Sequence, residues 1–242
     1  MHSEVDRAQR LRCEMARLFG TDYFEERAEG EWTNEFYDWY KPIAQKLYSQ
    51  NKDRDRADPL YLRGGPTDEY PWGHGIAFPD PPAPLSAKIT KLPGGVLPDF
   101  IRRVGCVSER VKNKIEEIEP GIHQFFPVDV VLPDGSGVAG RYWRFCNMNL
   151  LDTLVLEKSA HMYAKYPNQE KFPNYFRYEH NANGPPVLVL SKSVIGGKAV
   201  WLDYKLQKDF FSDQLADWLD AKAISGWEEH KSAVQPVTII EV

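Results

Sequence analysis

The chain has 242 residues, which is enough for one large domain or for a domain with an appendage. Its 42% hydrophobic and 27% charged residues are typical of a soluble globular protein, and its formal net charge of −5 argues against general nucleic-acid binding. The three cysteines are scattered and include no CxxC pair, which indicates a reduced, cytoplasmic protein. The charged start predicts no signal peptide, and the lack of a long apolar run predicts no membrane span.

The first part of the chain, residues 1–85, is expected to be a mainly helical and irregular N-terminal region. Apolar spacing predicts a helix over 4–18, and aromatic residues at helical spacing predict another from Thr33 past Pro42 to Leu47 or Tyr48. Residues 78–84 are rich in proline, which interrupts helices and strands. We therefore place a boundary near Pro84, which separates this region from a second domain over 86–242.

The second region, 86–242, is expected to be α+β with antiparallel hairpins. A Pro-Asp-Gly turn between apolar runs predicts a hairpin with strands at His123–Leu132 and Arg141–Met148. Val187–Leu190 predicts another strand, and Val194–Leu202 predicts a second hairpin turn with a return strand to about Tyr204. Residues 236–242 could add a last strand. Hairpins among few helices are typical of the α+β class.

Two segments about a hundred residues apart share one pattern, in which a serine and an acid precede aliphatic residues at helical spacing. Ser108 precedes Val111 and Ile115, and Ser212 precedes Leu215 and Leu219. A serine hydroxyl can cap the free N–H groups at a helix start, and an acid behind it favours the positive end of the helix dipole. The pattern predicts two similar units, each with a serine-capped helix that ends before a glycine.

A search for catalytic motifs finds no Gly-x-Ser-x-Gly, HExxH, Walker loop or GxGxxG. The Gly-Gly pairs lack the lysine and helix start of a phosphate-binding loop, so turns are the better interpretation. The histidines lack the spacing of a zinc site. We therefore expect no cofactor, no metal and no catalytic residues.

Two places nevertheless offer an alternative enzymatic interpretation. His74 lies between glycines that leave it accessible, and His123 opens a strand that is expected to pair with the strand carrying Cys146. A small hydrolase or a damage-reversing enzyme could use His74 or a His123/Cys146 pair. The competing interpretations are a surface histidine at position 74 and a buried, inert cysteine at position 146.

The segment from Asp22 to Tyr40 combines acids and aromatic side chains, and Arg27 is its only basic residue. One interpretation is an amphipathic helix whose aromatic residues enter the core. The other is a partner-binding surface, because aromatics act as interface anchors and acids steer a basic partner. The partner-binding hypothesis names six residues: Glu31, Trp32, Glu35, Tyr37, Asp38 and Trp39.

Two blocks of the sequence resemble a known family. The first runs from Val107–Val111 to Pro120–Val128, and the second combines Val200–Asp203, Phe210–Leu215 and Ile224–Gly226. In order and separation they are similar to the Imm11 family of bacterial immunity proteins (MXAN-0049-type, formerly DUF1629), over roughly 86–232. The segment after Gly226 departs from the family pattern, because Trp227 is followed by two acids and a histidine where an apolar strand is expected.

The resemblance implies an α+β immunity protein of a polymorphic toxin system, without a cofactor and without catalytic residues. Such a protein binds a cognate toxin and protects the cell that makes both. We therefore expect a cytoplasmic, non-enzymatic inhibitor whose partner is a toxin rather than a nucleic acid or membrane. A structural or adaptor module of a secretion locus is a third interpretation. The sequence does not indicate the oligomeric state.

Overall fold

The computed structural model describes residues 17–18, 29–51, 75, 77–101, 104–138, 142–164, 176–178, 187–206, 208–227 and 238–242. Most of the helix expected over 4–18 therefore lies outside the described residues. Its last two positions do not continue a helix, because Arg17–Leu18 form a short strand, β1. Both mixed sheets and helices are present, which confirms the α+β class.

A six-stranded sheet forms the larger half of the molecule, in the order β2-β3-β6-β7-β5-β4. Its strands are β2 (Glu29–Trp32), β3 (Leu85–Lys91), β4 (Phe100–Ile101), β5 (Cys106–Ser108), β6 (Gln124–Val131) and β7 (Tyr142–Cys146). β6 and β7 pair antiparallel with Gln124 opposite Cys146, so the first expected hairpin is confirmed. β3 and β6 run parallel, an arrangement that hairpin patterns alone do not predict.

The smaller half is built around a four-stranded sheet in the order β1-β13-β12-β8. The strands β8 (Leu150–Leu151), β12 (Val200–Asp203) and β13 (Lys208–Phe211) complete this sheet. Two strand pairs lie beside it, one of β9 (Met162–Ala164) with β10 (Phe176–Tyr178), the other of β11 (Val187–Leu190) with β14 (Thr238–Glu241). β14 confirms the strand expected in the tail.

The second expected hairpin is wrong. Residues after β11 form a short helix, α4 (Lys192–Ile195), which ends at Gly196 in the left-handed conformation with φ of 57°. The glycine pair therefore ends a helix instead of turning a hairpin. β12 does not return along β11; it pairs with β13 and β8, whereas β11 runs parallel to β14.

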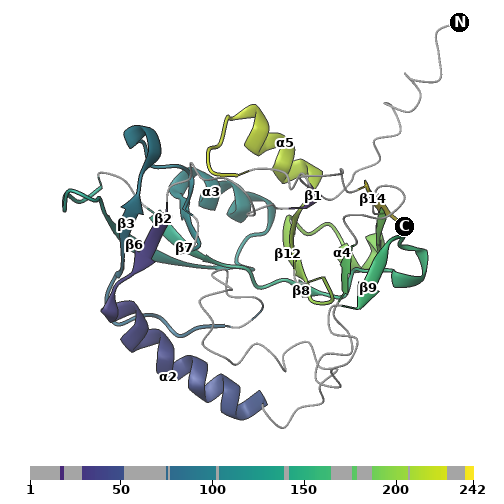
Figure 1. Cartoon of the computed structure of the whole chain (residues 1–242), viewed down its shortest axis with the longest axis horizontal. Coiled ribbons are helices and arrows are strands. Elements are labelled where there is room, and N and C mark those ends of the chain that lie inside the picture. Colours follow the sequence, from purple (N-terminus) through teal and green to yellow (C-terminus); the bar gives the residue numbers. More distant parts are fainter. Residues whose placement is uncertain are drawn as a thin grey trace, which may run out of the picture.

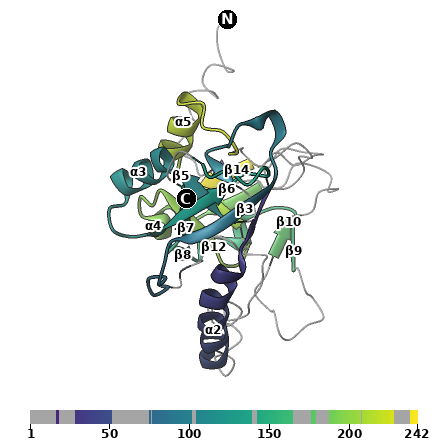
Figure 2. The same ribbon diagram turned by 90° about the vertical axis from the view of Figure 1, so that its left-hand side faces the viewer.

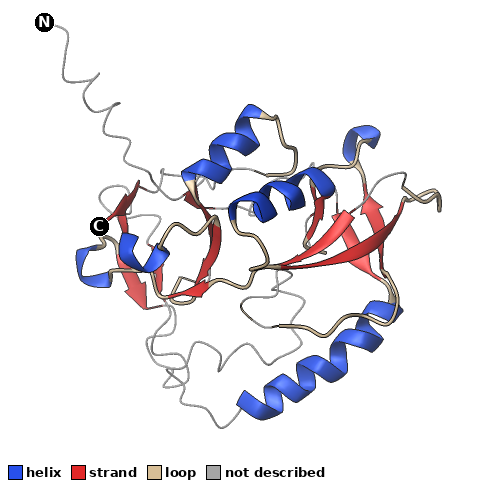
Figure 3. Ribbon diagram, turned by 180° about the vertical axis from the view of Figure 1, so that it is seen from behind, coloured by secondary structure: helices blue, strands red, loops and turns tan. Residues whose placement is uncertain are grey.

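Helices cover the two sides of the molecule. Figures 1 and 2 show α3 (Glu109–Ile118) and α5 (Asp213–Ala221) together on one side, and α2 (Asn34–Asn51) on the opposite side, beneath the six-stranded sheet. Figure 3 shows the same arrangement from behind. The 3-10 helices η1 (Pro93–Gly95) and η2 (Leu156–Lys158) are single turns. α2 confirms the helix expected from Thr33 through Pro42.

The described residues form three hydrophobic cores. The first lies under α3 and α5, where Val111, Ile115, Leu215 and Leu219 are fully buried. The second lies between α2 and the six-stranded sheet and includes Phe36. The third lies in the smaller half and includes Trp201 and Phe210. Residues before Pro84 therefore pack on residues after it, since β2 pairs with β3 and α2 covers the same sheet.

Ser108 and Ser212 both occupy the position before the first helical residue, but they act differently. Ser212 Oγ accepts a hydrogen bond from the N–H of Leu215 at 3.3 Å, as a helix cap does. Ser108 makes no such bond to α3. Its hydroxyl instead donates to Asp99 Oδ1 at 2.6 Å. The expectation that Ser108 caps α3 is therefore wrong, because its hydroxyl is hydrogen-bonded to the buried Asp99 carboxylate and not to the helix backbone.

Candidate partner-binding surface

The six residues of the partner-binding hypothesis lie together at the β2–α2 corner of the molecule. Glu31 and Trp32 end β2, and Glu35, Tyr37, Asp38 and Trp39 lie in the first turns of α2. The three acids are exposed, and the three aromatic side chains are half-buried. The acidic side chains therefore face solvent, whereas the aromatic rings face the sheet.

The aromatic rings pack around Phe36, which is 3% exposed. Trp32 and Tyr40 both stack on Phe36, with their ring centroids 4.1 and 5.3 Å from the centroid of the Phe36 ring. Trp39 contacts Phe126 of β6 edge-on at 5.7 Å. These contacts are those of an amphipathic helix laid on a sheet, so most of the aromatic surface contributes to the core.

The acids of this surface have more basic neighbours than the sequence of the segment indicates. Glu31 lies directly opposite Lys88 in the β2–β3 ladder. Lys41, one turn after Tyr37, places its Nζ 5.4 Å from the Tyr37 ring centroid. Lys88 is distant in sequence, so only strand pairing brings it to Glu31. The surface is therefore of mixed charge, with the acids concentrated at the start of α2.

His123 and Cys146 are not arranged as a catalytic pair. The N–H of Met148 donates to His123 Nδ1 at 3.2 Å, so Nε2 carries the proton and donates to Glu119 Oε2 at 3.1 Å. Both ring nitrogens are therefore engaged inside the fold. Burial raises the pKa of the Cys146 thiol more than nearby Arg144 lowers it, which keeps the thiol protonated. His74 lies outside the described residues.

Glu119 shows how the interior uses its carboxylates. Its Oε2 also accepts the N–H groups of Ala199 and Val200 at 2.8 and 3.2 Å, and Oε1 accepts from Asn149 Nδ2 at 2.9 Å. Burial would raise the pKa of Glu119, but the hydrogen bonds from His123, Asn149 and Ala199 outweigh it and leave the pKa below its ordinary value. This carboxylate joins the end of α3 to β12.

Two more carboxylates make similar junctions. Asp99 accepts from Ser108, Arg110 and Ser225, which connects the start of α3 to the turn after α5. Asp203 Oδ2 accepts from Thr153 Oγ1 at 2.6 Å, which connects β12 to the segment after β8. Sequence reasoning missed these roles. A weak signal existed at Glu119, since an acid at a helix C-terminus opposes the dipole and needs another reason to be there.

Within the described part of the chain, no group of three or more histidine, cysteine, aspartate or glutamate side chains is placed to hold a metal ion. Among the same residues, no helix combines the length and apolar character needed to cross a membrane.

The molecule is thus an α+β protein with internally engaged carboxylates and an acidic, aromatic-backed corner. Residues 32–233 match the Imm11 immunity protein family, so the chain belongs to that family. No curated protein matches the sequence. The family match confirms the resemblance but begins well before residue 86. Five residues of the partner-binding hypothesis, Trp32 to Trp39, therefore lie inside the family region and not in an added segment.

Proposed function

We propose that this protein is a non-enzymatic, cytoplasmic immunity protein that binds a cognate bacterial toxin and neutralises it by occlusion. The observation that carries the proposal is membership of an immunity protein family over residues 32–233. An immunity protein acts on the toxin made beside it, so the partner is a protein.

The engagement of the candidate catalytic groups supports binding over catalysis. Both ring nitrogens of His123 hold neighbouring groups in place, and the Cys146 thiol is buried and protonated. A nucleophile needs an accessible thiolate and a general base needs a free nitrogen. Neither group meets its requirement.

The β2–α2 corner is the proposed docking surface. Glu31, Glu35 and Asp38 are exposed at the start of α2, and Tyr37 and Trp32 lie half-buried beside them. Acids of this kind accelerate association with a basic partner, while half-exposed aromatic rings supply contact area. The rigid backing of Phe36 and Phe126 would hold these groups in place without a partner.

The test is co-expression with the toxin encoded by the neighbouring open reading frame. We expect the protein to restore growth, to co-purify with the toxin and to inhibit its activity in a purified assay. His74→Ala and Cys146→Ala should protect as well as the wild type. A folded Cys146→Ala or His74→Ala variant that binds the toxin but fails to protect would support the enzymatic alternative. Binding without inhibition of the purified toxin would support the adaptor alternative.

A further inference from the structure

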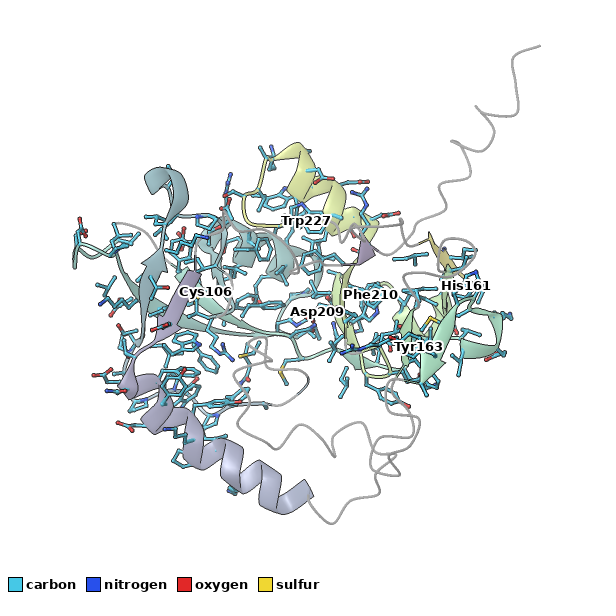
Figure 4. All side chains as sticks on the ribbon, in the orientation of Figure 1. Cys106, His161, Tyr163, Asp209, Phe210 and Trp227 are labelled. Carbon is cyan, nitrogen blue, oxygen red and sulfur yellow. The ribbon has the colours of Figure 1, made fainter. Side chains whose placement is uncertain are left out.

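Arg144 is a charged residue in the core between α2 and the six-stranded sheet, behind the proposed docking surface. It lies on β7 and is only 3% exposed. Its register partners are Cys106 on β5 and Phe126 on β6. Figure 4 labels Cys106 on the sheet, with α2 below it. Both partners belong to the core that α2 covers, so the guanidinium lies on that side of the sheet.

Contacts on the sheet side hold the guanidinium in place. Its Nη1 donates a hydrogen bond to the Val104 carbonyl oxygen at 3.0 Å, and it also hydrogen-bonds to the Cys146 side chain on the same strand. Val104 lies in the turn before β5 and packs against β2, where a Cβ on Gly30 would lie 3.4 Å from Val104 Cγ1. A planar guanidinium that is bonded in this way cannot turn freely. Its position is therefore set by groups outside the docking surface.

The same guanidinium contacts two rings of the β2–α2 corner. Its Cζ lies 5.2 Å from the Trp32 ring centroid and 5.3 Å from the Phe36 ring centroid. At these distances a cation attracts an aromatic ring, and the attraction is strongest away from water. Trp32 ends β2 and is half-buried. Without a fixed neighbour its ring could adopt other rotamers, so the contact with Arg144 favours one orientation.

We propose that Arg144 is a positioning residue for the docking surface, because it holds the Trp32 ring in the orientation that contacts the toxin. This role rests on the proposed function. Arg144 is too buried to touch a partner and acts through Trp32. An anchor that is already ordered loses less entropy on binding, and ordering one such side chain changes an affinity about fivefold. Stability alone does not require the charge, since apolar residues commonly replace buried ions without loss.

The first test uses the full chain without a toxin. Isotope-labelled tryptophan gives one indole N–H signal per ring in an NMR spectrum, and the Trp32 signal is the one absent from Trp32→Phe. In Arg144→Met this signal should shift and broaden, because a flexible apolar side chain orients the ring less than a fixed cation does. The matched control is Arg177→Met, which removes an exposed arginine on β10 and should leave the signal unchanged. Leu219→Ala, which truncates the core under α5, should leave it unchanged as well.

The second test measures affinity for the toxin encoded by the neighbouring open reading frame. Trp32→Ala should weaken binding at least about tenfold. Arg144→Met should weaken it about fivefold, although its Tm stays equal or rises. The double variant should bind no more weakly than Trp32→Ala alone, because Arg144 acts through that ring. Arg144→Lys keeps a cation beside the rings but loses the planar fork, so its affinity should lie between those of the wild type and Arg144→Met.

The outcomes separate the positioning role from the docking surface on which it rests. Unchanged toxin affinity in Trp32→Ala would contradict docking at the β2–α2 corner and would overturn the positioning role with it. Weakened binding of Trp32→Ala, together with wild-type binding of Arg144→Met and Arg144→Lys, would overturn the positioning role alone. An unchanged Trp32 signal in Arg144→Met would do the same. So would a double variant whose loss is the product of the two single losses, since independent structural defects combine in that way.

Discussion

Asp99 is the residue at which the two family-like blocks meet. Its Oδ1 accepts from Ser108 at 2.6 Å and its Oδ2 accepts from Ser225 Oγ at 3.0 Å. Gly226 makes this approach possible: its φ is 80°, and a Cβ there would lie 2.4 Å from the carbonyl oxygen of Phe100. The serine–glycine turn after α5 is therefore shaped by contact with the segment before α3.

The two helix-start serines are expected to differ in their contribution to stability. Ser212→Ala removes an ordinary cap and should lower the free energy of unfolding by about 1 kcal/mol. Ser108→Ala removes a hydrogen bond to a carboxylate, so the loss should be about 2 kcal/mol. Chemical denaturation of both variants measures the difference. A smaller loss for Ser108→Ala than for Ser212→Ala would contradict the assignment of Ser108 to Asp99.

Asp99 also predicts a pH dependence. Burial alone would raise the pKa of Asp99, but hydrogen bonds from Arg110, Ser108 and Ser225 lower it from 3.8 to about 2. Because the folded pKa lies below the unfolded one, the contribution is fully present above about pH 4 and disappears as the pH falls to about 2. The unfolding free energy of Asp99→Asn should therefore fall less over this range than that of the wild type. Asp129→Asn, an exposed control on β6, should behave as the wild type does.

At the scale of elements, α5 contributes mainly through one buried face. Leu215 and Leu219 are 0% exposed in the core that α5 shares with α3. Leu219→Ala should lower the free energy of unfolding by about 2–5 kcal/mol, because it leaves a cavity that the packed helices cannot fill. Gln214→Ala, on the exposed face of the same helix, should change it by less than about 0.5 kcal/mol. Equal losses in the two variants would show that α5 is not packed as described.

The attachment of strand β1 to the rest of the fold is expected to depend on the ion pairs of Arg17. Arg17 pairs with three carboxylates of α5: Nε with Asp213 at 3.2 Å, Nη1 with Asp220 at 2.9 Å, and Nη2 with Asp217. The β1–β13 ladder itself covers two residues. Asp217 and Asp220 are largely exposed, so salt should weaken the contact.

Arg17→Ala should therefore speed amide exchange in β1 and at the β13 edge while the Tm changes by only a few degrees. In the wild type, high salt should have the same local effect. Alternate N–H groups of a strand point to opposite neighbours, so the β13 amides that face β12 serve as the internal control. Unchanged exchange in Arg17→Ala would show that the ladder holds without the arginine.

Local patterns predicted those elements whose stability is itself local. Helical spacing located α2, α3 and α5, and the Pro-Asp-Gly turn located the β6–β7 hairpin. The parallel β3–β6 and β11–β14 pairs were not predictable, because parallel partners are chosen by the tertiary fold and not by a connecting turn. The pair Gly196–Gly197 was misinterpreted because glycine suits a helix end as well as a hairpin.

The site was less predictable than the fold. The acids and aromatics of the β2–α2 corner are visible in sequence, but the opposing Lys88 is added by strand pairing. Arg144 gave no signal, since a charged residue in an expected hairpin strand is normally assigned to the solvent face. Its burial follows only from the placement of α2 over the sheet.

For the whole molecule, charge reversal tests the proposed docking surface. Glu31→Lys, Glu35→Lys and Asp38→Lys together change the formal net charge from −5 to +1, because each reversal adds two charges. The triple variant should associate with the toxin more slowly, and the difference should shrink at high salt. Binding kinetics at two salt concentrations measure both effects.

The matched control is the triple variant Glu116→Lys, Asp129→Lys and Glu157→Lys, which has the same net charge but changes acids on α3, β6 and η2. Equal slowing in the two triple variants would indicate steering by net charge and would contradict docking at the β2–α2 corner. Thermal unfolding should be measured for both, since Trp39 and Phe36 beside the reversed acids belong to the core.

The three carboxylate junctions also set the order in which a nascent chain can mature. Once β7 has been synthesised, all six strands of the larger sheet exist. The Asp99 carboxylate then still lacks its hydrogen bond from Ser225, which is 126 residues further on. The Glu119 carboxylate lacks its hydrogen bond from Ala199, which is 80 residues further on. Until α5 leaves the ribosome, the apolar face that it covers is open, and Asp99 lacks its hydrogen bonds from Ser225. Chaperones should therefore hold the emerging protein until α5 closes over the sheet.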